Sequence, residues 1–149
     1  MKNWYYGILL LSLLASCSPK EKPKEESIIR GPKAQIAERL HPLYDSIMAV
    51  HDDEAMPLYE PVVTNRIRIK NSYDSITAIT AQDSLLISDL NAAGDSMMQW
   101  MRDFEQDFEG WAEEKTETYL RSELSRINRV NDLMRKAIQS AENRKTEDE

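Results

Sequence analysis

The chain has 149 residues, and its 26 acidic side chains outnumber the 19 basic ones, which gives a formal net charge of −7 at pH 7. This charge argues against a nucleic-acid partner, because binding to phosphates requires a basic surface. The only cysteine is Cys17, so an internal disulfide bond and a zinc site made of several thiolates are both excluded. Packing must therefore stabilise the fold.

The first residues have the pattern of a bacterial lipoprotein signal. Lys2 precedes an apolar run from Trp4 to Leu14, which is too short to span a bilayer as a mature helix. The run leads into Leu14-Ala15-Ser16-Cys17, which resembles a lipobox, the motif whose cysteine is acylated before cleavage ahead of it. We therefore predict a signal peptide at residues 1–16 and lipidation of Cys17, with an ordinary secretory signal as the alternative. Two or three acyl chains at this cysteine would anchor the protein stably to a membrane.

Residues 17–31 have the composition of an acylated N-terminus followed by a flexible tether. Pro19 and Pro23 stand among alternating lysines and glutamates, and almost nothing is apolar before Ile28. Such a segment cannot bury enough apolar surface to fold. Ser18, rather than an aspartate, follows the cysteine, and this resembles the sorting pattern of outer-membrane lipoproteins. We predict a lipid-anchored protein of the cell envelope, at the outer membrane of a Gram-negative bacterium.

Apolar residues at helical spacing begin after Pro32, a residue suited to the first position of a helix. They recur at steps of four and three residues: Ile36, Leu40, Leu43, Ile47 and Val50. Pro57 and Pro61 follow, and each removes an amide donor and crowds the preceding turn. We therefore expect the first long helix to be kinked or broken near Met56.

The stretch from Tyr73 to Trp111 predicts a long central helix. Asn71-Ser72 is suited to cap its start, and Gly110 is suited to end it. Apolar residues recur at steps of three and four along the whole stretch. A second apolar seam lies beside the first and contains Ile76, Ile79, Leu86, Leu90, Ala93, Met97, Trp100 and Phe104. Two seams require two neighbouring helices.

The last helical pattern runs from Leu120 to Ala141 and again steps by four and three residues. Together the three patterns predict an all-α fold, an antiparallel bundle of three long helices over residues 32–143. A frayed charged tail should follow at residues 144–149. A helix pair that is completed by self-association is the alternative architecture.

Histidine and methionine are the residues with potential for metal chemistry. Pairing the first two helices around a turn near residue 71 places His51 near residue 91, in layers next to Met48, Met97 and Met134. Imidazole and thioether groups together suit Cu(I) or the axial ligation of haem. Methionines at helical spacing are more often adaptable core filler, and a lone histidine on a helix face is more often packed than ligating. We therefore predict neither a metal nor a cofactor, and we keep these four residues as candidates.

Catalysis by a nucleophile has no support in the sequence. Ser46 lies near His51 and Asp52 along the chain, but no glycine-rich elbow or structured loop is present to form an oxyanion hole. A bundle with short connections also offers no obvious pocket. We predict that the protein is not an enzyme.

Two segments, Met48 to Pro57 and Ala93 to Phe104, resemble a group of small Bacteroidota lipoproteins that are labelled viral A-type inclusion protein-like. The resemblance rests on a shared motif set: His51, Met56, Pro57, Met97, Met98, Trp100 and Met101. Family members more often have a shorter His-Asp-Glu step before the methionine and proline, and this chain has one additional acidic residue. The resemblance implies an envelope-anchored helical protein of unknown activity.

The sequence thus favours a non-enzymatic cell-envelope lipoprotein whose helical bundle is a protein-interaction or structural module. It would contact the membrane through its lipid anchor, and it would bind an unknown envelope protein or a second copy of itself as a coiled-coil spacer. The alternative function is periplasmic copper or haem binding through His51 and the methionines.

Overall fold

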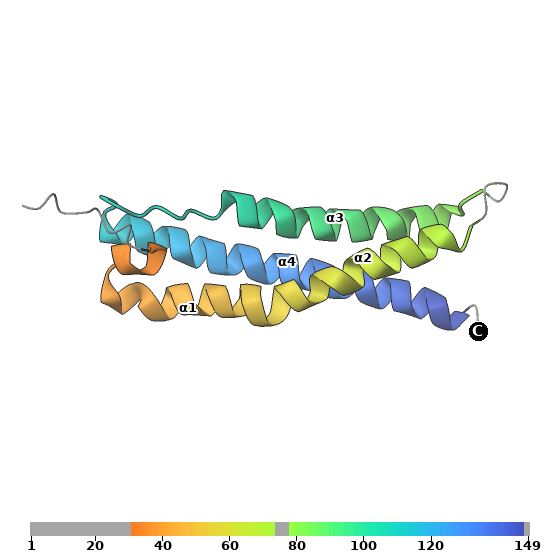
Figure 1. The fold of residues 1–149 in the computed structure, drawn as a ribbon, viewed down its shortest axis with the longest axis horizontal. Coiled ribbons are helices and arrows are strands. Elements are labelled where there is room, and N and C mark those ends of the chain that lie inside the picture. Colours follow the sequence, from red (N-terminus) through yellow and green to blue (C-terminus); the bar gives the residue numbers. More distant parts are fainter. Residues whose placement is uncertain (1–30, 74–77, 148–149) are drawn as a thin grey trace, which may run out of the picture.

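The computed structural model describes residues 31–73 and 78–147, and the regular structure in these ranges is entirely helical (Figure 1). Three helical rods pack together, so the all-helical prediction is confirmed. The predicted signal peptide, the lipidation residue Cys17 and the tether up to residue 30 lie outside the described residues. Within the described ranges, the helices are too short or too polar to cross a bilayer.

The first rod begins later than its apolar spacing suggested. Two short 3-10 turns, η1 (Pro32–Gln35) and η2 (Glu38–Leu40), precede α1 (His41–Ala49), so the prediction of an α-helix from Pro32 was wrong. The reason is Pro42, which lies in the first turn of α1. An α-helix running through this region would press the proline ring against the carbonyl of Glu38 and leave that carbonyl without a donor, whereas a first turn tolerates proline.

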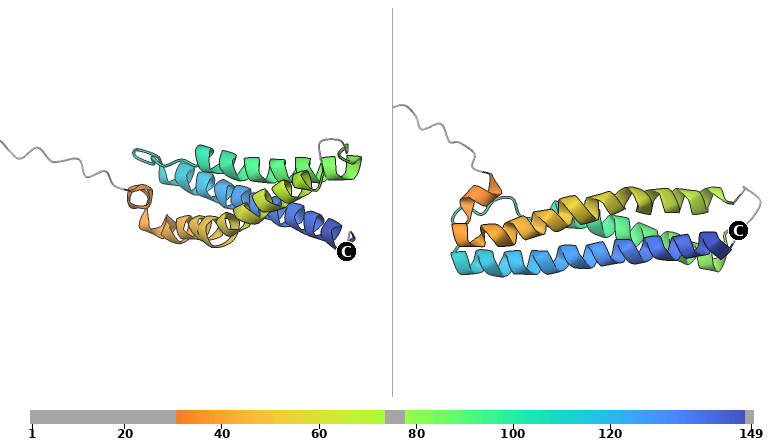
Figure 2. Two further views of the ribbon diagram at one scale, coloured as in Figure 1. Left: turned by 45° about the vertical axis from the view of Figure 1, so that its right-hand side comes forward. Right: turned by 90° about the horizontal axis from the view of Figure 1, so that it is seen from below.

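A π-helical segment, η3 (Val50–Ala55), joins α1 to α2 (Met56–Asn71). At its end the amide of Met56 donates to the carbonyl of His51, five residues earlier. Pro57, which has no amide to donate, lies in the first turn of α2, so the wider π turn accommodates the proline without ending the helix. The rod changes direction between α1 and α2, near the expected kink, and then continues through Pro61 (Figures 1 and 2).

The central helix is shorter than predicted at both ends, because α3 spans only Ala81–Asp103. It starts at the cap residue Thr80, whose side-chain oxygen accepts a hydrogen bond of 3.1 Å from the amide of Asp83. The predicted cap Asn71-Ser72 instead ends α2. Residues 74–77, within the predicted helix, lie outside the described residues.

Phe104 to Trp111 continue the apolar spacing of α3, but this part of the chain is not helical. Phe104 has an extended backbone, and Gly110 lies in a turn with φ of 74°, a conformation that favours glycine. Two side chains bind the segment: the Tyr119 hydroxyl accepts the Glu105 amide at 2.6 Å, and the Gln35 amide oxygen accepts the Phe108 amide at 2.7 Å. The rings at 104, 108 and 111 therefore pack inward from a loop.

The last rod is α4 (Glu113–Glu147), which runs in the same direction as the first rod. The helix α3, which comes between these two rods in the sequence, runs in the opposite direction (Figures 1 and 2). The tail predicted from residue 144 overlaps the end of α4, which continues to Glu147. Arg144 forms an ion pair with Asp83 at the start of α3, which explains why helical order continues at this point.

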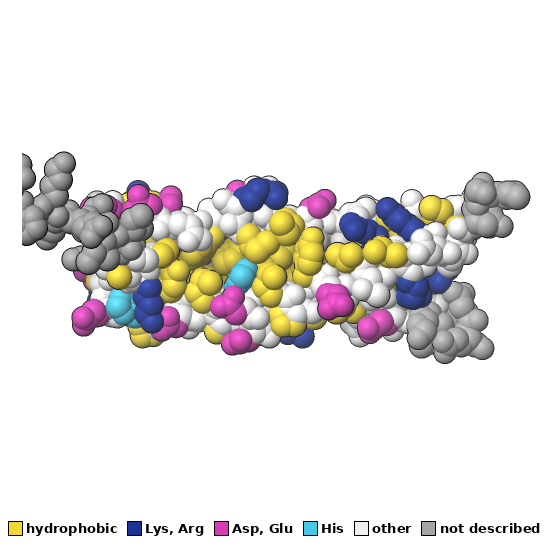
Figure 3. Space-filling model, in the orientation of Figure 1, with side chains coloured by type: hydrophobic (Ala, Val, Ile, Leu, Met, Phe, Trp, Pro, Cys, Tyr) yellow, Lys and Arg dark blue, Asp and Glu magenta, His cyan; other side chains and the backbone are white. Residues whose placement is uncertain are grey.

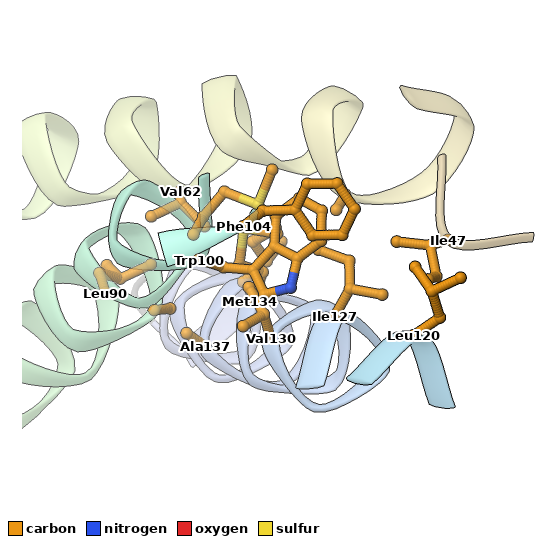
Figure 4. Packing of buried hydrophobic residues seen from close by; sticks show 14 of the residues in the cluster. Ile47, Val62, Leu90, Trp100, Phe104, Leu120, Ile127, Val130, Met134 and Ala137 are labelled. Carbon is orange, nitrogen blue, oxygen red and sulfur yellow. The ribbon is translucent and has the colours of Figure 1, made fainter. Parts of the chain in front are cut away.

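The core runs the whole length of the bundle, and Figure 4 shows its central part. All three rods and the loop after α3 contribute side chains that are completely or almost completely buried: Ile47, Val62, Ile69, Leu90, Met97, Phe108, Leu120, Ile127 and Met134. Most of these positions lie on the seams that the sequence predicted.

Candidate functional site

The π-helical segment places His51 against α3. The Nδ1 atom of His51 lies 2.7 Å from the Asp52 carboxylate, and its ring centroid is 5.3 Å from that of Trp100. The histidine side chain is 16 % exposed, so one edge of the ring still reaches solvent. Because π-helical turns occur often at functional sites, this histidine is the first candidate to consider.

The register between the first two rods differs from the prediction, which placed His51 beside residue 91. The chain between α2 and α3 extends to Thr80, so α3 starts later and His51 lies beside Trp100. Of the candidate metal ligands, Met97 and Met134 are completely buried and Met48 is half-buried. In the described part of the chain, no three His, Cys, Asp or Glu side chains form a group that could hold a metal ion.

Aromatic rings form a continuous cluster from His51 to the loop after α3. The Trp100 and Phe104 centroids are 5.0 Å apart, and Phe104 lies 6.1 Å from Tyr44 and 6.2 Å from Tyr119. Three further contacts of 5.5–5.9 Å connect Tyr119, Phe108 and Trp111. Ring contacts of this kind add stability beyond the area that they bury. The cluster therefore holds the loop to the bundle.

The surface over this cluster is apolar on one face of the molecule. Figure 3 shows a band of hydrophobic side chains between α3 and the first rod, with a histidine within it. Half-buried residues of the two rods supply this boundary: Tyr44 contacts Phe104, Tyr59 approaches Gly94, and Met48 and Met101 lie one turn from His51 and Phe104. We call Tyr44, Met48, Tyr59 and Met101 the apolar band.

Glu54 fastens the π-helical segment to α4. Its carboxylate accepts hydrogen bonds of 2.7 Å from Asn131 Nδ2 and 3.1 Å from Arg135. The Asn131 Oδ1 atom is buried and has no hydrogen-bond partner in the described structure, and the same holds for Trp100 Nε1 and His41 Nε2. Leaving such an atom unpaired costs roughly 1–3 kcal/mol. No pattern in the sequence indicated this contact between Glu54 and α4.

An open groove of about 740 Å³ lies between α3 and α4. Trp100 lines it, and all of its lining residues come from these two helices and not from the rod that contains His51. Ten residues line it: Asp95, Ser96, Met98, Gln99, Trp100, Arg102, Arg126, Arg129, Val130 and Leu133. Sequence reasoning missed this groove. Its signal was present on α4, where Arg126, Val130 and Leu133 lie on one helix face at steps of four and three.

Arg126 joins α4 to α3 beside this groove. It donates to Asp103 at 2.9 Å and to Glu123, which is 3 % exposed, at 3.1 Å. Hydrogen bonds from Gln99 and Arg126 lower the pKa of Asp103. The two acids neutralise Arg126, so this arginine serves mainly to hold the helices together.

A second buried ion pair closes the opposite end of the bundle. Asp83 is 2 % exposed, and Arg144 contacts both of its carboxylate oxygens, with Nη2 at 2.8 Å from Oδ2. The Tyr73 hydroxyl donates to the same carboxylate. The hydrogen bonds from Arg144 lower the pKa of Asp83, although burial opposes this shift. Asp83 interrupts the apolar seam of α3 because it binds α4.

The structure brings together only some of the residues on which the sequence resemblance rests. His51 and Trp100 are in contact. The others have different surroundings: Met56 is 41 % exposed, Met97 is fully buried, and Met98 lines the groove. The Ser46 hydroxyl donates to the carbonyl of Pro42 at 2.8 Å, which is a contact within its own helix.

Comparisons with protein-family models, with curated proteins and with solved structures gave no significant match to this chain.

Proposed function

We propose that the protein is a non-enzymatic lipoprotein of the cell envelope whose antiparallel three-helix bundle binds another envelope protein. The apolar band carries this proposal. Tyr44, Met48, Tyr59 and Met101 are each only half-buried, and they pack against the core from the first rod and α3. Figure 3 shows hydrophobic surface along the boundary of these two rods. Contiguous apolar surface on a soluble domain is typical of protein contacts, and aromatic residues and methionine are enriched in the cores of interfaces.

The N-terminal pattern supports the location. Acylation of Cys17 would hold the bundle at the outer membrane, with the segment up to Gly31 as its tether. The resemblance to small Bacteroidota lipoproteins agrees with this placement. Expression in a Gram-negative host with an alkyne-labelled fatty acid tests it: the full chain should take up the label, and the variant Cys17→Ala should lose both the label and its membrane association.

Photo-crosslinking in cells tests the interaction. A photoreactive phenylalanine at Met48, within the apolar band, should give one reproducible crosslinked protein in the organism that produces this chain. The matched control is Ser122, which is exposed on α4 and does not belong to the band. Equal products from both positions, or none from Met48, would contradict the proposal.

Copper or haem binding remains the second candidate because of the contacts of His51. Asp52 holds the Nδ1 atom, which leaves Nε2 as the ligand atom, and Met48 lies one turn earlier on the same helix face. Titration of the full chain with Cu(I) against a competing chelator, and a haem absorption spectrum, test this candidate. Binding that His51→Ala and Met48→Leu each abolish would support it, and no binding would end it.

A further inference from the structure

The groove between α3 and α4 is lined by apolar side chains at its base, which we call its floor, and by arginines at its edges, which we call its rim. Val130 is buried, Met98 is half-buried and Leu133 is 49 % exposed, so aliphatic and thioether surface faces outward here. Arg102 and Arg129 line the same groove, one on each helix, and a single carboxylate, that of Asp95, lines it as well. The groove therefore presents an apolar strip with an arginine on each side, and its arginines outnumber its carboxylate.

The side chains that accept hydrogen bonds from these two arginines are neutral. Arg102 donates to the amide oxygen of Gln99 at 2.7 Å, and Arg129 donates to the Ser125 hydroxyl at 2.8 Å. Within residues 31–73 and 78–147, neither forms a salt bridge, in contrast to Arg126. In a chain with a net charge of −7, such a place selects an acidic partner, since guanidinium groups bind carboxylates in a bidentate geometry.

The shape of the groove selects the kind of partner. Small-molecule sites usually enclose most of the ligand surface, whereas this groove is open along two helices. Amphipathic helices bind in such grooves through apolar anchors at steps of three and four residues. The floor also contains the indole of Trp100, whose Nε1 atom has no partner in the described structure and points toward α4 (Figure 4).

We propose that the α3–α4 groove binds an acidic amphipathic helix of the partner protein. Its apolar side chains contact Met98, Val130 and Leu133, and its glutamates or aspartates pair with Arg102 and Arg129. This inference rests on the proposed function, because it names the chemistry of the partner at a second surface of the same module.

Peptide binding to the full-length chain in neutral detergent tests the inference. The probe is a fluorescent helical peptide of about 18 residues, long enough to form several turns, with leucine on one face and glutamate on the other. A peptide with lysine in place of glutamate is its control. Fluorescence anisotropy should show binding of the glutamate peptide, with the lysine peptide at least tenfold weaker.

Charge reversal on the rim then locates the binding. The double variant Arg102→Glu and Arg129→Glu should weaken binding of the glutamate peptide roughly tenfold or more, because two charge-assisted contacts are replaced by repulsion. The matched control is Arg121→Glu with Lys136→Glu, which makes the same change in net charge at exposed positions of α4 that do not line the groove. This control should stay within about twofold of the wild-type affinity. Circular dichroism and thermal melting confirm that both variants fold.

Four results would overturn the inference: no peptide binding, equal weakening in both double variants, binding of phosphatidylglycerol vesicles in place of the peptide, or rim-dependent self-association in the ultracentrifuge. The two proposals also fail separately. A partner crosslinked at Met48 without peptide binding rejects only the groove, whereas peptide binding without that crosslink rejects only the apolar band.

Discussion

The two halves of the bundle use different side chains to fill the same kind of space. In the half that contains α2, small and aliphatic residues predominate, such as Gly94, Ala137 and Ala141. A Cβ atom on Gly94 would come within 3.6 Å of Val62. In the half that contains α1, the π-helical turn changes the direction of the first rod and aromatic rings, Trp100 among them, fill the core.

The large rings of the α1 half are themselves buried, since Trp100, Phe104 and Phe108 are 2 %, 5 % and 1 % exposed. The half-buried apolar band extends along both halves, because Tyr59 belongs to α2 and lies beside Gly94. The two halves therefore differ in the kind of side chain that fills the core. We call these regions the aliphatic half and the aromatic half, and four predictions test the distinction.

The largest effect should come from Phe108→Ala in the aromatic half. Phe108 is 1 % exposed and contacts Trp111 and Tyr119. Its removal should lower the free energy of unfolding by about 4 kcal/mol, through lost burial and the cavity that remains. Urea denaturation measures this change. A loss below about 1 kcal/mol would mean that the loop at 104–112 does not contribute to the core.

Asp83→Ala should have the next largest effect and act on the aliphatic half. It leaves the charge of Arg144 without its buried partner, which should cost about 3 kcal/mol at neutral pH. The pKa of Asp83 is lowered in the fold, so this contribution is fully present above the usual carboxyl range and is lost as the pH falls below that range through the lowered pKa. The gap between the two proteins should therefore close below about pH 4.

Asp89→Ala is the matched control for this prediction, because Asp89 lies on the same helix and is exposed. It should change the free energy of unfolding by less than about 0.5 kcal/mol. A gap between wild type and Asp83→Ala that does not depend on pH would show that lost packing, and not the ion pair, causes the destabilisation.

Alanine at two glycines should have opposite effects of about 1 kcal/mol each. At Gly94 the added Cβ atom meets Val62 and Tyr59 at ordinary contact distances, and alanine favours a helix, so stability should rise. At Gly110 the φ angle of 74° strains any L side chain, so stability should fall. Thermal melting measures both. A loss at Gly94→Ala would mean that the aliphatic half cannot accept even one methyl group.

The smallest effect should come from Trp100→Phe. This change removes a buried N–H that has no partner in the described structure, which is favourable, and it reduces the ring volume, which is unfavourable. The two effects should cancel to within about 1 kcal/mol in urea denaturation, whereas Trp100→Ala should cost several times more. A loss above about 2 kcal/mol for Trp100→Phe would indicate that the indole nitrogen is hydrogen-bonded.

Many buried residues could be predicted from the spacing of apolar residues along the chain. A helix that buries one face must place its apolar residues at steps of three and four. Leu90, Met97, Ile127 and Met134 were placed on seams and are completely buried. The sequence Thr80-Ala81-Gln82-Asp83 has the residues of a helix start, but we predicted a continuous helix through it. Thr80 is a cap and Asp83 binds Arg144 from α4.

The candidate sites were less predictable. The contact of His51 with Trp100 depends on the length of the connection after α2, since each added residue shifts the register of α3 by about 1.5 Å. The basic groove depends on two helices that are adjacent in space, and no single stretch of sequence contains both Arg102 and Arg129.

The sequence by itself determined that the chain is helical and which faces are buried, because helical spacing and apolar burial are local properties of each segment. It also determined where proline must disturb a rod. Only the tertiary structure decided that Pro57 produces a π turn and not a break, and that Phe104 to Trp111 pack inward from a loop at helical spacing. The physical reason is that a ring or a carboxylate is stabilised by whichever element it meets across the bundle, and its neighbours along the chain do not specify that element.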